Sequence, residues 1–225
     1  GVAGWSDQDV FLDEIRQSTD LLKTRFGWGE RTLTLINNDK TADETPIASM
    51  QNLAAALRGI ARRMDPERDL LVLTLSSHGS PEGFALRYDD FVERTLDPQT
   101  LRGLLDAAGV RNRVVIVSSC YSGTFVEPLK TPDTMILTAA AADRTSFGCA
   151  DDRTWTWFGE ALFDKGLVPG ASLSDAFVSA RATIADWERK QNLTPSNPQI
   201  FVGDGIARRF PAVVGHAPAL AARAD

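Results

Sequence analysis

The stretch Asp69-Leu-Leu-Val-Leu-Thr-Leu-Ser76, which ends two residues before His78, decides the fold class of this chain. Its apolar run is nearly continuous and of strand length, which is typical of a parallel strand covered on both faces. A second run of the same kind, Arg113-Val-Val-Ile-Val-Ser118, ends two residues before Cys120. Because ligands bind at the carboxyl ends of the strands in open α/β sheets, His78 and Cys120 are expected to lie together in a functional site.

The rest of the chain alternates between apolar runs and helical patterns. Helix-start signals support the boundaries, because Asp97 can cap a helix that has Pro98 at its first position, and Ser172 with Asp175 resembles a capping box. Strands that alternate with helices predict a parallel sheet with right-handed crossovers. The further predicted strands are 32–36, 134–140 and 199–203, and the predicted helices are 9–26, 49–64, 98–108, 155–165 and 173–191.

Length and composition are those of one globular domain, with 225 residues of which 43% are hydrophobic and 24% charged. We expect a single domain over residues 1–210 and a peripheral tail over 211–225. Gly1-Val-Ala-Gly4 resembles the end of a strand, so we expect a truncated first strand and a missing N-terminal segment of a longer protein. The compartment stays open, because such a segment can carry an export signal or a membrane anchor; the chain itself is expected to be soluble.

Composition excludes several classes of partner. The formal net charge of −6 provides no basic stripe for nucleic acid. No run of about 18 apolar residues is present, so no membrane contact is expected within this chain. The two histidines and two cysteines show no metal-ligand spacing, and no phosphate-loop or dinucleotide motif occurs. We therefore expect no metal and no cofactor.

Cys120 and His78 are the pair that thiol catalysis requires. A free thiol, with a pKa of about 8.5, is only partly ionised at neutral pH, and a nearby imidazole can accept its proton or protonate a leaving amine. Gly79 has no side chain, so its N–H can approach a substrate and, with the N–H of Cys120, hold a developing oxyanion. A single His or Cys at such a place is more often structural, and it is the pairing that favours catalysis.

Three segments resemble motifs of one enzyme family. Ser77-His78-Gly79-Ser80 resembles the His-Gly motif of legumain-like and caspase-like cysteine peptidases, and the segment from Ser118 to Gly123 resembles their nucleophile motif. The segment from Ile136 to Cys149 resembles a block that separates legumains from caspases, and similarity to bacterial legumain-like members extends to about Asp204. The resemblance implies a three-layer caspase-like α/β fold, with a mostly parallel central sheet flanked by helices.

The same resemblance implies a cofactor-free cysteine endopeptidase that acts on a protein or peptide substrate. Cys120 would form the thioester intermediate, His78 would be the general acid and base, and Gly79 would supply an oxyanion N–H. Legumains carry an Arg and a nearby Asn in their first block. The segment from Gly4 to Asp9 can be aligned with that block in two ways that differ by a gap, so Asp7 is a candidate third catalytic residue. Either Asp7 or Asp9 could select a basic substrate side chain through a charged hydrogen bond.

The resemblance also implies substrate-binding residues. Ser118 and Thr156 stand where animal and plant legumains carry acidic pocket residues, so a preference for Asn at the cleavage site is not implied. Ser146 matches a pocket residue of the family, although a serine in a polar loop is by default a turn former. Ser119, beside the nucleophile, and Trp155 are candidates for the cleft, although aromatic residues near a helix start are more often core residues.

Three alternatives to hydrolysis stay open. A transpeptidase or transamidase would use the same Cys120 thioester and pass the acyl group to an amine. A catalytically silent binding module would keep the fold without the reaction, although the retention of both His78 and Cys120 disfavours it. Thiol–disulfide exchange is disfavoured because Cys149, expected to be a packing residue, is 29 positions from Cys120 and no Cys-x-x-Cys pair exists.

Overall fold

The computed structural model describes residues 1–89 and 92–215, and within them six strands form a central sheet in the order β2-β1-β3-β7-β8-β9. Neighbouring strands are parallel except β8 and β9, which pair antiparallel. The mostly parallel sheet confirms the predicted fold class. Its strands are β1 (Val2–Ala3), β2 (Leu35–Ile36), β3 (Leu71–Ser76), β7 (Arg113–Ser118), β8 (Thr134–Thr138) and β9 (Gln199–Val202).

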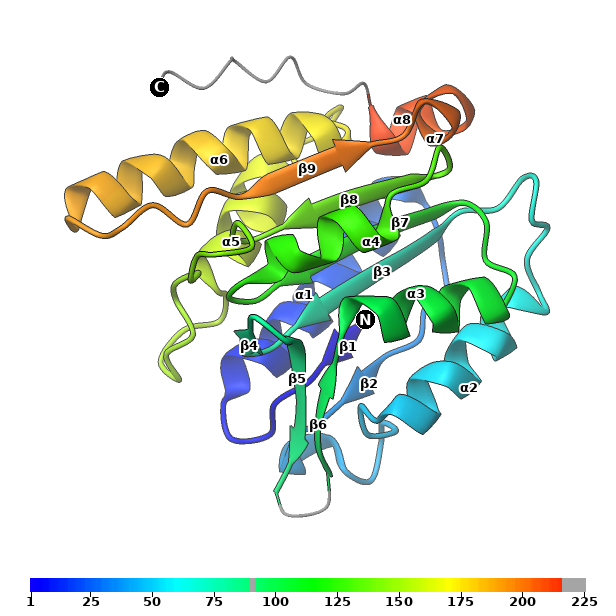
Figure 1. The fold of residues 1–225 in the computed structure, drawn as a ribbon, viewed down its shortest axis with the longest axis horizontal. Helices are drawn as coiled ribbons and strands as arrows, with labels where there is room; N and C mark the ends of the chain where they lie inside the picture. The colour runs from blue at the N-terminus through cyan, green and yellow to red at the C-terminus, as the bar shows by residue number, and fades with distance from the viewer. Residues whose placement is uncertain (90–91, 216–225) are drawn as a thin grey trace.

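Helices cover both faces of this sheet and give the domain three layers (Figure 1). Val115 and Val117 of β7 pack with side chains of α2, α3 and α4, whereas Val114 and Ile116 pack with α6 and the segment before it. Burial on both faces explains why the apolar run is continuous. The helices are α1 (Asp9–Phe26), α2 (Met50–Ala61), α3 (Pro98–Ala107), α4 (Val126–Leu129), α5 (Trp157–Gly159), α6 (Leu173–Lys190), α7 (Asp204–Arg209) and α8 (Pro211–Val214), with short segments η1 (Asp39–Thr41), η2 (Ser122–Phe125) and η3 (Glu160–Gly166).

Capping residues set the helix starts that the sequence predicts. Asp97 accepts a hydrogen bond from the Thr100 backbone N–H at 2.9 Å at the start of α3. Ser172 and Asp175 form a complete capping box at the start of α6. The predicted helix over 155–165 is different, because α5 starts only at Trp157, after Thr156 as its N-cap, and continues as the π-helical η3.

A three-stranded antiparallel sheet is absent from the prediction, which treats residues 81–83 only as a turn. It consists of β4 (Gly79–Ser80), β5 (Gly83–Tyr88) and β6 (Val92–Leu96). Phe84 and Leu86 are buried, whereas Glu93 and Arg94 are exposed, so the apolar signal occupies only alternate positions and is weak in the sequence. This sheet starts directly after His78 and therefore borders the predicted site.

The segment predicted as a peripheral tail begins with α8. Val214 of this helix is fully buried, and its carbonyl oxygen accepts a hydrogen bond from Ser174 Oγ at 2.7 Å. Val213 and Val214 therefore pack with side chains of α6 in the same apolar cluster. Residues 216–225 of the predicted tail lie outside the described residues.

A cavity of about 580 Å³ lies at the amino ends of β1 and β3. Side chains of α1 and α2 line it together with Val2 and Leu71, so its walls are mostly apolar. It opens at the end of the sheet opposite His78 and Cys120, and it is not the substrate cleft that the sequence predicts.

The described residues contain neither a membrane-spanning helix nor a cluster of metal ligands. Over 1–89 and 92–215, no helix combines the length and apolar content that a bilayer-crossing helix needs. The same residues contain no group of three or more His, Cys, Asp or Glu side chains placed to hold a metal ion.

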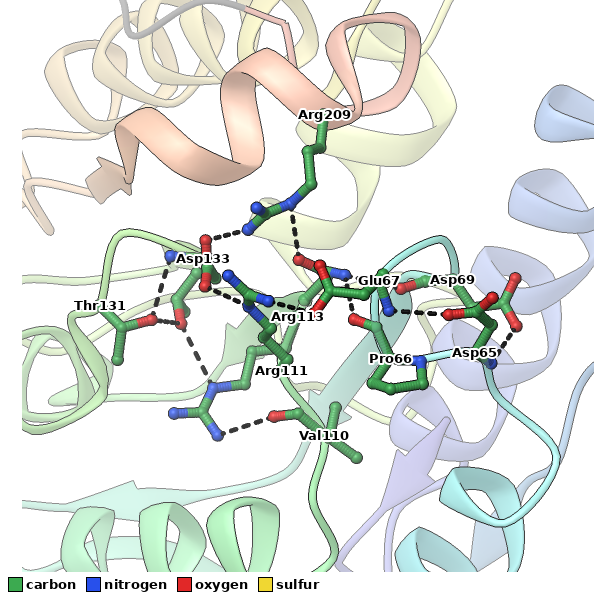
Figure 2. Close-up of polar contacts among 12 residues, drawn as sticks. Asp65, Pro66, Glu67, Asp69, Val110, Arg111, Arg113, Thr131, Asp133 and Arg209 are labelled. Carbon is green, nitrogen blue, oxygen red and sulfur yellow. Dashed lines mark hydrogen bonds and ion pairs between the residues drawn. The ribbon is translucent and has the colours of Figure 1, made fainter.

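Charged residues join the elements at the amino ends of β7 and β8 (Figure 2). The Asp133 carboxylate accepts from Arg111 Nε at 2.8 Å and pairs with Arg209 of α7. Arg209 Nε also donates to Asn112 Oδ1 at 3.0 Å. Burial by itself raises the pKa of Asp133, but the hydrogen bonds and charges of Arg111 and Arg209 outweigh it, and the pKa lies below its usual range.

Replacing Asp133 by Asn is expected to lower the free energy of unfolding at pH 7 by about 1–3 kcal/mol, because two guanidinium groups lose a charged acceptor. A carboxyl with a depressed folded-state pKa stabilises the fold above its unfolded-state pKa of about 4, and this contribution disappears as pH falls through the folded-state pKa. The difference in free energy of unfolding between wild type and variant should therefore be smaller in acid, and urea unfolding at pH 7 and pH 3 can measure it. Glu127→Gln, in an exposed ion pair with Lys130, is the control and should change stability by less than about 1 kcal/mol.

Candidate active site

The register of β3 and β7 brings the predicted pair to one edge of the sheet. Ser76 pairs with Ser118, so His78 and Cys120 each stand two residues beyond the same rung. The backbone contact continues past the strand ends, because Ser77 N donates to the carbonyl oxygen of Ser118 at 3.2 Å. The sequence-predicted partners therefore leave adjacent strands side by side.

Gly79 lies against the nucleophile segment. A Cβ atom added at Gly79 would overlap the carbonyl oxygen of Cys120 and lie 2.9 Å from Ser119 Oγ. Only a residue without a side chain allows this approach. The close packing places the backbone of Gly79 beside that of Cys120, as an oxyanion site formed by both N–H groups requires.

The half-buried Cys120 thiol contacts the loop after β8. The backbone N–H of Ser146 donates to Cys120 Sγ at 3.3 Å, and the Ser146 hydroxyl lies 3.6 Å from the same sulfur. Ser146 is thus a direct neighbour of the predicted nucleophile.

Gln8 is the hydrogen-bond partner of His78, and sequence analysis missed it. Gln8 Nε2 donates to the carbonyl oxygen of Cys149 at 2.6 Å, which leaves Gln8 Oε1 to accept from His78 Nε2. This orientation assigns the proton of a neutral imidazole to Nε2 and leaves Nδ1 free to exchange protons with a reacting group. One signal in the sequence was available: Gln8 stands directly before the predicted helix over 9–26, and Gln is not a preferred N-cap residue.

The His78 ring lies between two aromatic side chains. Its centroid is 4.8 Å from the Trp5 ring and 5.0 Å from Phe11, both in edge-on geometry. Burial lowers the pKa of His78 below its usual value, and the negative charge of Asp7 only partly opposes this effect. The imidazole is therefore neutral at neutral pH, the state in which it can accept a thiol proton.

Replacing Gln8 by Glu is expected to raise the pKa of His78 by about one unit or more, because a carboxylate then faces Nε2 in place of a neutral amide. The midpoint of the His78 titration, measured by NMR of the imidazole protons, should move to higher pH. Asp7→Asn is the matched comparison and should move the midpoint slightly lower, since it removes a charge that raises this pKa. An unchanged titration in the Gln8 variant would contradict the assigned contact.

Asp7 and Asp9 make contacts with other residues. Asp7 accepts from Ser6 Oγ at 2.6 Å and pairs with Arg87 at 3.7 Å, so it acts on His78 through charge alone. Asp9 pairs with Lys40, and its pKa lies below the usual range because of the hydrogen bonds from Lys40 and from Asn38.

Most of the predicted substrate-binding residues point into the protein. Ser118 and Thr156 are 2% and 5% exposed, and their hydroxyl oxygens lie 3.0 Å apart. Ser119 is buried, and its hydroxyl donates to the carbonyl oxygen of Cys120 at 3.2 Å. Trp155 is buried and stacks on Phe163, with ring centroids 6.0 Å apart. Of this group, Ser146 is the half-buried residue at the thiol.

The two cysteines are both free thiols. Cys149 packs against the apolar cluster of α1 and β1, as predicted for a packing residue. Burial raises the pKa of Cys149, and the proximity of Cys120 raises it further. Cys149 is therefore a neutral thiol at neutral pH, and its carbonyl oxygen anchors Gln8.

Comparisons with known proteins identify a family and a fold. A family model described as "Peptidase C13 family" matches residues 48–208. The crystal structure of caspase-1 from Spodoptera frugiperda is similar, with a TM-score of 0.61 and 12% sequence identity, over 90% of this chain and 84% of that chain. At this identity the likeness concerns the fold alone, which is caspase-like. No curated protein matches the sequence significantly.

Proposed function

Since the chain belongs to the peptidase C13 family, which indicates a cysteine peptidase kind of function, we propose that it is an endopeptidase with Cys120 as nucleophile and His78 as general acid and base. The observation that carries the proposal is the pairing of Ser76 with Ser118, which places the two side chains at adjacent strand ends. The contact of Ser146 N–H with the Cys120 sulfur and the close approach of Gly79 to Cys120 support it.

The proposed reaction has two steps. The Cys120 sulfur, after giving its proton to His78, forms a C–S bond to the scissile carbonyl carbon, and the carbonyl electron pair moves to oxygen, where the N–H groups of Gly79 and Cys120 hold it. The C–N bond then breaks, and His78 protonates the departing amine, leaving a thioester. A water molecule gives a proton to His78, attacks the thioester carbon and releases the acid, and Cys120 leaves as the thiol.

Ser118 and Thr156 bear on substrate choice. Both positions carry hydroxyls that are buried and contact each other, so neither offers a carboxylate to a substrate side chain. We therefore propose that selectivity comes from the groups around the thiol, of which Ser146 is the nearest polar one. Asp7 and Asp9 can contribute only by exchanging their present partners, Arg87 and Lys40, for a basic substrate.

The test is digestion of a diverse peptide mixture between about pH 4 and pH 8, with and without an added small amine, followed by mass analysis of the products. Hydrolysis yields fragment pairs whose masses sum to the peptide plus one water. Fragments that carry the amine would assign acyl transfer to the same thioester instead. An absence of both kinds of product across the pH range, from protein that is folded by circular dichroism, would contradict the proposal.

A further inference from the structure

Glu14 is a buried carboxyl group that the proposed reaction does not use. It lies on α1, is fully inaccessible to solvent, and accepts a hydrogen bond from Ser76 Oγ at 2.9 Å and another from the Thr156 backbone N–H at 2.9 Å. A Cβ added at Gly159 would overlap its carboxylate, so the group is enclosed on that side as well. Burying a carboxyl group is costly unless it is hydrogen-bonded, and every bond here goes to an element that supports the site.

The hydrogen bond between Glu14 and Ser76 supports the segment that carries the imidazole. Ser76 is the last residue of β3 and stands two residues before His78. The same helix that carries Glu14 also begins beside Gln8, which contacts the His78 ring. Helix α1 therefore holds the His78 segment both at the end of its strand and at its ring.

The hydrogen bond between Glu14 and the Thr156 N–H supports the loop that contacts the thiol. Next to Thr156, the Trp157 backbone N–H donates to the carbonyl oxygen of Phe147 at 3.0 Å. The residue before Phe147 is Ser146, whose N–H donates to Cys120 Sγ at 3.3 Å. Glu14 thus fixes the start of α5, and α5 fixes the loop that contacts the thiol.

A third contact closes the cluster around Glu14. Ser118 Oγ lies 3.0 Å from Thr156 Oγ1, and Ser118 is the last residue of the strand that delivers Cys120. Burial raises the pKa of Glu14, and hydrogen bonds with Thr156, Ser118 and Ser76 only partly oppose this effect. No cation is among these contacts, so the group works as a hydrogen-bonding centre and not as half of an ion pair.

From this geometry we propose that Glu14 is a positioning residue for the thiol reaction: its carboxyl group holds the strand ends of His78 and Cys120 and the loop whose Ser146 N–H contacts the sulfur in one arrangement. The inference rests on the proposed function for its effect on peptide cleavage. Its effect on the chemical environment of Cys120 is independent of any peptidase activity.

The experiment compares Glu14→Leu, which fills the space without hydrogen-bonding groups, with Glu14→Gln. The Gln amide can accept from Thr156 N–H and donate to the Ser76 hydroxyl, so it should restore the arrangement. Alkylation of Cys120 by iodoacetamide is followed against pH, with Cys120 and Cys149 distinguished by peptide mass. In Glu14→Leu the Cys120 profile should shift, because the sulfur loses its hydrogen bond from the Ser146 N–H. With a cleavable peptide, kcat should fall by about 10- to 100-fold with little change in KM.

Glu188→Leu is the matched control. Glu188 is also a buried carboxyl group and accepts from Ser196 N at 2.8 Å, but among the described residues it makes no hydrogen bond to Ser76, to Thr156 or to the loop that contains Ser146. The Glu188→Leu variant should be less stable than the wild type and keep the wild-type alkylation profile of Cys120. If Glu14→Leu does not fold, Glu14→Asp, which withdraws the carboxyl group by one methylene, and Ser76→Ala decide the question by the same readout.

A wild-type alkylation profile in folded Glu14→Leu would overturn the proposal. If that variant does not fold, the same profile in both Glu14→Asp and Ser76→Ala would overturn it. If the Glu14→Leu profile is shifted but the wild-type protein cleaves no peptide, the positioning role stands and the peptidase function is refuted. A shifted profile together with reduced kcat and rescue by Glu14→Gln would support both.

Discussion

Replacing Cys120 by Ala is expected to lower peptide cleavage by at least about 10⁴-fold, the largest effect of any single substitution, because no thioester can then form. The side chain is half-buried, and the change removes one sulfur atom, so circular dichroism and thermal unfolding should remain close to wild type. The rate is measured on the best peptide from the mixture digestion. Trapping of an acyl-enzyme, seen as added mass on the protein, should occur in the wild type and not in the variant.

Cys149→Ala is the matched control for this prediction. It removes the other thiol of the chain, which packs against α1 and β1, and should keep most of the cleavage activity. Retained cleavage by Cys120→Ala, or loss only in Cys149→Ala, would show that the nucleophile has been assigned to the wrong thiol.

Replacing Gly79 by Ala has the second largest expected effect, a fall in kcat of about 10²- to 10³-fold. The added Cβ overlaps the carbonyl oxygen of Cys120, so the two segments must move apart and the N–H groups proposed to hold the oxyanion lose their placement. Overpacking at this contact should also lower the free energy of unfolding by about 1–3 kcal/mol. Steady-state kinetics and urea unfolding of the same preparation separate the two effects.

Gly103→Ala, on α3, is the control for the glycine substitution. A Cβ at Gly103 meets no atom within 4 Å, and helix propensity predicts a gain in stability of about 1 kcal/mol without a change in kcat. If Gly79→Ala keeps the wild-type kcat, the N–H of Gly79 is not part of the oxyanion site.

Local patterns predicted the elements whose residues interact with near neighbours in the chain. Helix α1 has the bounds Asp9–Phe26 that were predicted, and α3 begins at Pro98 behind its Asp97 cap. The strand predicted over 32–36 comprises only Leu35–Ile36 in the structure, because the neighbouring strand β1 pairs with it only through Val2 and Ala3. Helix propensity did not foresee η3, because a π-helical turn depends on how its side chains fit against α6.

Contacts that join distant parts of the chain were the ones that sequence analysis missed. Gln8 reaches His78 across 70 positions, and Glu14 reaches Thr156 across 142. A Glu within a helix is an ordinary surface residue by composition, and nothing local distinguishes it. Gln is a poor N-cap residue, but that signal does not say which distant residue Gln8 contacts. Ser118 and Thr156 were predicted to line a pocket, and their contact with each other became visible only when both were placed on the same side of the sheet.

The sequence by itself determined the α/β class, the two buried strands, and the delivery of His78 and Cys120 to their carboxyl ends, because continuous apolar runs and caps act over a few residues. The tertiary structure alone decided the contacts around that pair: Gln8 with the imidazole, the N–H of the already predicted Ser146 with the sulfur, and Glu14 with the end of β3. The physical reason is that hydrogen bonds between distant residues depend on the register of the strands and on how the helices pack against them, neither of which a short stretch of sequence encodes.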